Sequence, residues 1–264
     1  MAPRLRAPRR TIGLALGLGL AMLAPLATSS VRADDDAPRH APAREHGAHG
    51  DRVILVPTAQ TQPAGTLFLT DYEIVVPSIG YAWSDRVQTV VTGTTDFSQF
   101  VFVDLSMKAA LLRSRHLHLS ATASLDYAAG EGEELPFGRA TLVAQLCADA
   151  GCRSSLSLAG SLIAHDAPDT ILPLGLGAGF VARLSDGVDV LLEYSAVLNA
   201  GPELELIDLP LYLVGYGARF NFGSQWALDV TLLRPMQEDP GLRSGDVALF
   251  QFLGVPFLAL TFRL

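Results

Sequence analysis

Residues 116–127, HLHLSATASLDY, alternate between polar and apolar side chains along their whole length. Successive side chains of an extended strand point to opposite faces, so this stretch separates into two surfaces. The apolar surface holds Leu117, Leu119, Ala121, Ala123, Leu125 and Tyr127, and the polar surface holds His116, His118, Ser120, Thr122, Ser124 and Asp126. A helix, with about 3.6 residues per turn, would mix the two sets. The pattern therefore predicts a β-strand between an apolar and a polar environment.

The same alternation continues from Asp71 to the last residue. It breaks into about twelve segments of roughly 8 to 15 residues, the length of a strand that crosses a bilayer. We expect these strands near residues 66–76, 78–84, 87–95, 100–113, 116–128, 138–148, 152–164, 170–184, 188–199, 209–222, 226–235 and 247–264. One face for lipid and one for a wetted interior predict an all-β fold, an antiparallel transmembrane β-barrel of about 12 strands (roughly 10 to 14).

The connections between these segments alternate in length. Tight connections occur at 84–86, 114–115, 149–151, 185–187 and 223–225, and longer ones at 130–137, 165–169, 200–207 and 237–246. Outer-membrane barrels have short periplasmic turns and long external loops, and an even strand number leaves both termini in the periplasm. The tight turns and the N-terminal leader are therefore expected on the same, periplasmic side.

Aromatic residues gather beside both sets of connections. Those beside the tight turns are Tyr81, Trp83, Phe220, Phe222, Trp226 and Phe262, and those near the opposite rim are Tyr127, Tyr212, Phe250 and Phe252. Aromatic side chains favour the membrane–water interface, so this placement predicts two belts around the barrel. The alternative is that they form the core of a soluble β-sandwich.

The N-terminus has the pattern of a secretory signal. Four arginines precede an apolar run over residues 12–27, and Ala33 is a small residue suited to cleavage. We expect a cleaved signal peptide at 1–33, a flexible periplasmic leader at 34–64 and an outer-membrane β-barrel at 65–264. An uncleaved N-terminal anchor is the alternative, and no later run reaches the roughly 20 apolar residues of a spanning helix.

Charge argues against a nucleic-acid partner. Five arginines and no acidic residues lie in residues 1–33, so the chain without that segment has a net charge of −13 instead of −8. A protein this acidic is not attracted to phosphate backbones. The composition, 49% hydrophobic and 17% charged, suits a soluble core as well, so the predicted location rests on the alternation.

The last eight residues, FLALTFRL (257–264), resemble the terminal strand of Gram-negative outer-membrane β-barrel proteins. Leu258, Leu260 and Phe262 match the alternating apolar positions, and Leu264 departs from the usual closing aromatic. The resemblance implies that the barrel assembly machinery reads this strand. Residues 56–65 (VPTAQTQPAG), 71–73 (DYE) and 80–85 (GYAWSD) are similar to the opening of uncharacterised exported barrel proteins, which have no established activity to carry over.

Charged residues of both signs fall on the face expected to line the barrel interior. The lumen-lining set is Asp71, Glu73, Asp104, Lys108, His118, Asp126, Arg139, Arg183, Asp189, Glu193, Arg219 and Asp229, with His116 and Arg263 as further members. Such a lumen is either wet or closed by ion pairs, and the sequence leaves both readings open. Gly175, Gly177 and Gly179 point inward and leave space on one wall.

The two cysteines, Cys147 and Cys152, bracket a turn. An oxidising compartment favours a disulfide between them, whereas strict alternation places them on opposite faces unless Gly151 forms a bulge. Both states stay open at this point.

Catalytic and metal-binding patterns are weak. His118 and Ser120 share a face, but no third residue orients them and that face points to the lumen, so we expect no enzyme. No catalytic residue, cofactor, cofactor-binding residue or metal site is predicted, and the Asp and His residues of the leader are read as a solvated tail.

The predicted function is a narrow passive pore, with selectivity set by the lumen charges, or a structural membrane protein without catalysis. One alternative is a surface-binding or adhesion-type barrel that acts through its external loops, and another is a soluble periplasmic lipocalin-like carrier. The expected partners are outer-membrane lipid, lipopolysaccharide and the assembly machinery, and we expect a monomer.

Overall fold

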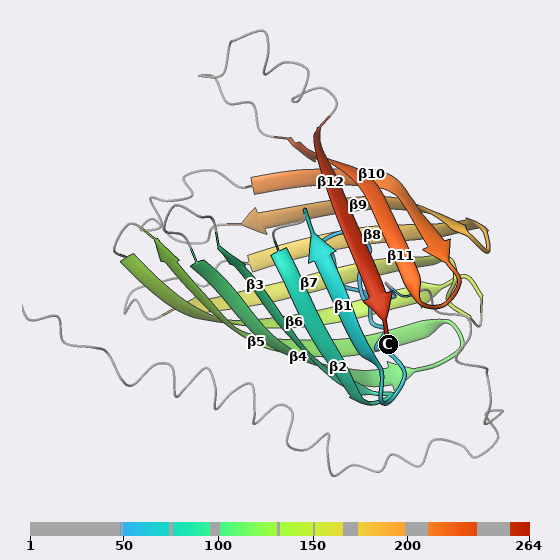
Figure 1. Cartoon of the computed structure of the whole chain (residues 1–264), viewed down its shortest axis with the longest axis horizontal. Helices are drawn as coiled ribbons and strands as arrows, with labels where there is room; N and C mark the ends of the chain where they lie inside the picture. The colour runs from blue at the N-terminus through green and yellow to red at the C-terminus, as the bar shows by residue number, and fades with distance from the viewer. Residues whose placement is uncertain are drawn as a thin grey trace, which may run out of the picture.

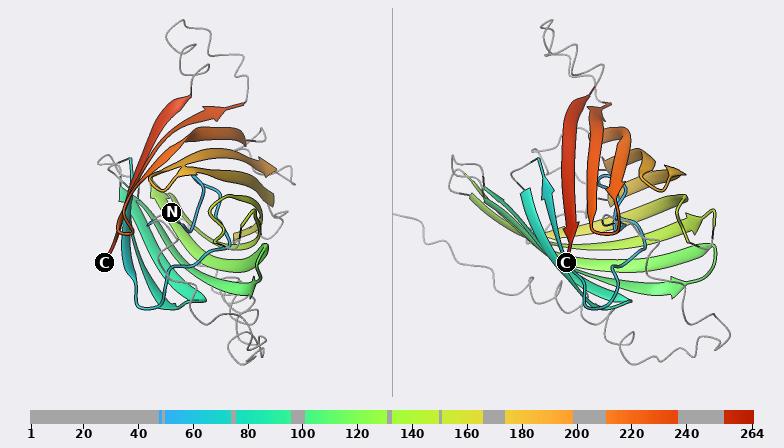
Figure 2. Two further views of the ribbon diagram at one scale, coloured as in Figure 1. Left: turned by 90° about the vertical axis from the view of Figure 1, so that its right-hand side faces the viewer. Right: turned by 45° about the vertical axis from the view of Figure 1, so that its right-hand side comes forward.

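The computed structural model describes residues 48, 50–73, 76–95, 101–130, 133–149, 151–165, 174–198, 211–236 and 254–264. These ranges form twelve strands: β1 (Leu67–Tyr72), β2 (Val76–Ser84), β3 (Val87–Thr95), β4 (Val101–Arg113), β5 (Leu117–Gly130), β6 (Glu133–Cys147), β7 (Ser155–His165), β8 (Leu174–Ser185), β9 (Val188–Leu198), β10 (Leu211–Phe222), β11 (Trp226–Pro235) and β12 (Val255–Arg263). Each strand pairs antiparallel with its neighbours along the chain, and β1 also pairs with β12 (Figure 1, Figure 2). The predicted twelve-stranded antiparallel barrel is confirmed.

Alternate side chains of each strand face the interior and the exterior. In β5, Ser120, Ser124 and Asp126 are buried, whereas Leu125 and Tyr127 are exposed. The exterior of the other strands carries exposed apolar side chains, with Leu142 63% and Leu192 49% exposed. Soluble proteins rarely expose so many large apolar side chains on one continuous surface, so the exterior is suited to lipid. Among the described residues, no helix is long and apolar enough to cross a membrane.

Exposed aromatic side chains surround the end of the barrel that carries the tight turns. Tyr81 and Trp83 meet edge to face with their ring centroids 4.8 Å apart. Trp226 and Phe262 lie on neighbouring strands with centroids 4.1 Å apart. Phe250 and Phe252, which the sequence assigned to the opposite belt, lie outside the described residues.

One predicted loop is a continuation of two strands. Gly130 pairs with Glu133, and the β5–β6 ladder runs on through Tyr127 and Pro136, so the long connection expected at 130–137 shrinks to a hairpin. The Gly, Glu and Pro of this stretch are typical of loops, but the adjacent strand satisfies its main-chain hydrogen bonds. The loops expected at 200–207 and 237–246, most of 165–169, and residues 1–47 with the predicted signal peptide lie outside the described residues.

Candidate functional site

Residues 50–62, here called the plug, lie inside the barrel, where Figure 2 shows the blue N-terminal segment within the ring of strands. The sequence assigned them to a flexible periplasmic leader. Instead, Val53 and Ile54 are 0% and 1% exposed. The plug joins β1 at the end with the tight turns, where the Asp85 carboxylate accepts a hydrogen bond from the main chain of Ala64 (2.8 Å).

The plug folds back on itself as a small hairpin. The main-chain N–H of Thr58 donates to the carbonyl of Asp51, and that of Val53 donates to the carbonyl of Val56, both at 2.9 Å. These bonds leave the main-chain N–H groups of the tip, residues 54–56, without partners inside the plug itself. The barrel wall supplies those partners.

Glu193, at the middle of β9, holds the tip of the plug. Its Oε2 accepts hydrogen bonds from the main-chain N–H groups of Ile54 (2.9 Å), Leu55 (2.8 Å) and Val56 (2.7 Å). Consecutive N–H groups that converge in this way form a small anion-binding concavity, and hydrogen bonds to a carboxylate are stronger than those between neutral groups. Glu193 is 2% exposed, and these three main-chain donors replace the water that its carboxylate would otherwise bind.

Cationic side chains of the wall bind the oxygen atoms of the plug. Lys108 Nζ donates to the carbonyl of Asp51 (3.0 Å), and Arg219 donates to the carbonyls of Arg52 (3.1 Å) and Val53 (2.8 Å). Nearer the tight turns, Arg113 donates to the Thr61 hydroxyl and Arg263 to the Gln62 side-chain carbonyl. Lysine and arginine side chains of the wall thus bind main-chain carbonyls of the plug, whereas the carboxylate of Glu193 binds its main-chain N–H groups.

Glycines in the wall make room for the side chains of the plug. A Cβ at Gly177 would lie 2.7 Å from Val56, one at Gly179 would lie 2.6 Å from Val53, and one at Gly215 would lie 2.8 Å from Ile54. Carbon atoms do not approach this closely, so no larger residue fits at these positions beside the native valine and isoleucine side chains of the plug. The plug therefore occupies the space that Gly177 and Gly179 were predicted to leave, whereas a Cβ at Gly175 would meet Ser161 of β7 at 3.3 Å and not the plug.

Two wall amides fix the part of the plug nearest the tight turns. The side-chain carbonyl of Gln145 accepts from the Ala59 N–H (3.1 Å), and that of Gln88 accepts from the Gln62 N–H (2.8 Å). Beside the plug, a small cavity of about 40 Å³ lies between Thr58 and Gln60 on one side and the wall of β6 to β10 on the other. The space beside this part of the plug is thus small and lined by polar and charged side chains.

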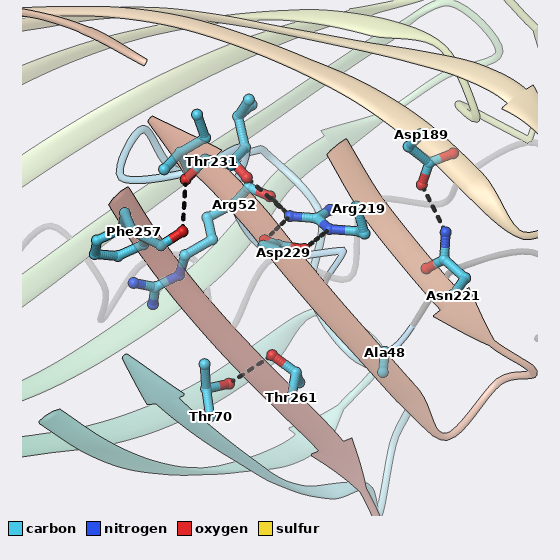
Figure 3. A network of polar contacts seen from close by, with 12 residues as sticks. Ala48, Arg52, Thr70, Asp189, Arg219, Asn221, Asp229, Thr231, Phe257 and Thr261 are labelled. Atoms are coloured by element: carbon cyan, nitrogen blue, oxygen red, sulfur yellow. Dashed lines mark hydrogen bonds and ion pairs between the residues drawn. The ribbon is translucent and has the colours of Figure 1, made fainter. Parts of the chain in front are cut away.

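The predicted lumen charges form ion pairs within the wall. Arg219 and Asp229 are 2.7 Å apart and Arg183 and Asp189 are 2.6 Å apart; Figure 3 shows the first pair beside Arg52. Nearer the end with the longer connections, Arg139 bridges Asp104 (3.0 Å) and Asp126 (3.3 Å). His118 also faces the interior, with Gln145 and Arg113 as its register neighbours.

Two residues of the predicted lumen set lie elsewhere. Asp71 pairs with Leu260 on the exterior face, while its neighbours Thr70 and Tyr72 point inward. Glu73 follows the end of β1 with a φ of 57°, and its carboxylate accepts from the main-chain N–H of Leu258 (2.6 Å). The inward face of β1 is set by Phe68, whose ring fills the space above Gly80, so the apparent charged face of this strand points outward.

Arg113 is a lumen residue that the alternation misses. A bulge between Ala110 and Leu112 shifts the register of β4 against β5, so Arg113 pairs with the inward-facing His118. Strict alternation carried through the bulge would place it on the exterior. Gln88 and Gln145 carry no charge, so they gave no signal in a search for charged residues.

The β6–β7 turn contains a disulfide between Cys147 and Cys152, whose Cα atoms are 4.6 Å apart. Cys152 has a φ of 53°, and this departure from extended geometry lets both sulfurs meet. In the same turn, slight burial is outweighed by hydrogen bonds from the Arg153 main chain and guanidinium, which together lower the pKa of Asp149. Because both sulfurs are in the disulfide, their proximity to His118 does not form a metal site.

His118 and Ser120 are not hydrogen bonded to each other. Among the described residues, His118 Nδ1 and the Ser120 hydroxyl are buried polar atoms without a hydrogen-bond partner. A serine nucleophile needs a base within hydrogen-bond reach. The geometry of this pair is therefore that of two polar wall residues.

The fold is similar to that of a porin of known structure. The chain superposes on "KdgM porin in complex with disordered oligogalacturonate" with a TM-score of 0.51 and 5% identity, covering 75% of this chain and 96% of that one. A second structure, "KdgM porin", gives the same TM-score and identity over 97% of its chain. The outer membrane protein Omp33 from Acinetobacter baumannii matches at a TM-score of 0.42 and 9% identity, a likeness too loose to argue from. No family model and no curated protein matches the sequence.

Proposed function

We propose that the protein is an outer-membrane barrel that forms a narrow passive pore, and that the plug closes this pore at rest. The observation that carries the proposal is that side chains of the wall hold the plug in the lumen. Within the described ranges, the plug does not pair with the wall strands as a further β-strand. A barrel with a purely structural role can fill its interior with its own side chains. Here inward glycines leave room for the plug, which on this proposal can leave the lumen again.

Insertion in the outer membrane is supported by the apolar exterior and by the fold shared with a porin. On this proposal the tight turns face the periplasm, which is also the side where the plug joins β1. Outer-membrane lipid and lipopolysaccharide would contact the exterior, and the barrel assembly machinery would bind β12. The protein would act as a monomer.

Insertion predicts a depth-dependent effect of charge on the exterior. Leu142, in β6, and Leu184, beside the β8–β9 turn, are 63% and 69% exposed. In lipid vesicles, Leu142→Arg should lower the free energy of unfolding by about 2 to 4 kcal/mol. Leu184→Arg should lower it by only about 0 to 1 kcal/mol, because its charge reaches the interface. Urea titrations of the two variants in vesicles measure the difference. Equal effects of the two substitutions would contradict insertion in this orientation.

Closure by the plug is tested by replacing it. A variant with residues 50–62 exchanged for an equally long Gly/Ser segment should form the same barrel, judged by its migration before and after boiling. In planar bilayers this variant should conduct in steps several-fold larger than those of the unaltered protein. A folded, inserted variant that stays silent would refute the pore and leave the barrel fold untouched.

A disulfide lock provides the matched control. The Cβ of Val56 lies 3.6 Å from the position of a Cβ at Gly177, within the range of roughly 3.5 to 4.5 Å found in disulfides. The pair Val56→Cys and Gly177→Cys should therefore trap the closed state when oxidised, and reductant should restore the conductance of the unlocked protein. If the oxidised and reduced forms conduct equally, ions pass without movement of the plug.

A further inference from the structure

The wall of the lumen recognises the plug mainly through its main chain. Glu193, Gln145 and Gln88 accept from main-chain N–H groups. Lys108 and Arg219 donate to main-chain carbonyls. These contacts do not depend on which side chains the bound segment carries. A wall that offers both acceptors for N–H groups and donors for carbonyls is complementary to a peptide.

Other classes of polar solute satisfy only part of this wall. A small anion would suit Lys108 and Arg219 but would meet the carboxylate of Glu193, which is 2% exposed. A cation would suit Glu193 and would be repelled by the same lysine and arginine. Arg219 already pairs with Asp229, but a filled lumen leaves Lys108 in need of an acceptor and Glu193 in need of donors. A buried charge without a partner is strongly unfavourable, so a ligand that brings both kinds of group fits best. Peptide main chain does so at each residue.

The glycines add a preference for certain side chains. Gly177, Gly179 and Gly215 face Val56, Val53 and Ile54, which are all β-branched, and Val53 and Ile54 form an apolar cluster with Val181 and Leu191 of the wall. The three positions where a side chain of the plug packs directly on a wall glycine are here called the glycine grooves. They suit branched apolar side chains, whereas longer polar ones would be buried without partners. The chemistry of the site is thus that of a short peptide with a branched apolar centre.

We propose that the lumen is a binding site for short peptides with branched apolar residues, and that the plug is a built-in stand-in for that ligand. The inference rests on the proposed pore, because a peptide reaches the site only when the plug has left. It assigns peptides as the solute class that the pore binds.

The test uses the full mature chain with the plug replaced by the Gly/Ser segment, solubilised in detergent. The probe is a fluorescent synthetic peptide with the sequence of residues 50–62, GDRVILVPTAQTQ, and anisotropy reports its binding without any need for conductance. Saturable binding is expected, together with competition by an unlabelled Val-Ile-Leu-Val peptide. A scrambled peptide of the same composition should bind at least about tenfold more weakly, since it places polar side chains in the glycine grooves.

Recognition of the main chain is tested by N-methylation of the three tip amides. Loss of the hydrogen bonds to Glu193 should weaken binding about 10- to 100-fold. Methylated and parent peptides that bind equally, or a maltooligosaccharide of similar size that displaces the probe, would overturn the proposal as non-specific filling of the lumen. If the peptide binds but the plug-replaced barrel is silent in bilayers, the proposed pore is refuted and the peptide site stands. If that barrel conducts but binds no peptide, the peptide site is refuted and the pore stands.

Discussion

Replacing Glu193 with alanine should release the plug and open the barrel. The substitution leaves the N–H groups of Ile54, Leu55 and Val56 without their acceptor inside the barrel. Each buried donor left unsatisfied costs about 1 to 3 kcal/mol, and outside the lumen water would satisfy all of them. We therefore expect the equilibrium to shift by at least about 100-fold toward the released plug.

Two measurements report this release independently. Hydrogen exchange at residues 54–56 should become fast in Glu193→Ala, and single-channel recordings should show the larger steps expected of the plug-replaced variant. Glu193→Gln retains an uncharged acceptor oxygen and should produce a smaller shift in the same direction. Adding the Val56→Cys and Gly177→Cys lock to Glu193→Ala should restore the closed conductance, which shows that the current depends on the plug.

Asp186→Ala is the matched control, because Asp186 is an exposed acid in the turn between β8 and β9, the strand that carries Glu193. It should leave both exchange and conductance unchanged. Slow exchange at 54–56 in Glu193→Ala would mean that the glycine grooves and the cationic donors hold the plug without the carboxylate, and that Glu193 does not control closure.

The alternation of side chains was sufficient to predict the barrel, because lipid and a polar lumen impose opposite demands on alternate positions of each long strand. Residues 117–127 show this most clearly, and their buried and exposed faces are those expected, whereas His116 precedes β5 and is exposed. On the short strand β1 the same rule is ambiguous. Leu69 and Phe68 are both apolar and Thr70 and Asp71 are both polar, so only the packing of Phe68 over Gly80 decides which face is inside.

The plug could not be found by this reasoning. Residues 50–62 have no alternation, and their burial comes from contacts with wall residues more than 100 positions away, such as Glu193 and Arg219. The local signal for the plug was indirect: Gly177 and Gly179, on the inward face of β8, leave room in the lumen for side chains from another part of the chain. Arg113 was missed for a different reason, since a single extra residue in β4 reverses the faces that follow it.

Replacing Gly179 with valine should also expel the plug, but by steric exclusion. A Cβ at this position would lie 2.6 Å from Val53 Cγ2 and 3.0 Å from Val53 Cβ, and a valine side chain would extend further into the same space. The barrel itself should tolerate the change, because valine favours a strand more than glycine does. In the plug-replaced variant we expect Gly179→Val to raise the free energy of unfolding by about 0.5 to 1 kcal/mol.

The same substitution should therefore have opposite effects on the two states. In the complete chain it should produce open-state conductance and fast exchange across the plug, while the barrel stays folded. Gly160→Val is the control, because Gly160 faces the exterior and a Cβ there meets no atom within 4 Å. It should stabilise the strand without opening the pore.

A double substitution decides whether the effect is local. Val53→Gly removes the side chain that Gly179→Val would strike, so the two changes together should restore closure more fully than Gly179→Val alone. The coupling free energy between positions 53 and 179 should be favourable and of order 1 to 3 kcal/mol, as for other residues in direct contact. A coupling near zero would mean that the valine opens the barrel by distorting β8, and the groove at Gly179 would then have no part in holding the plug.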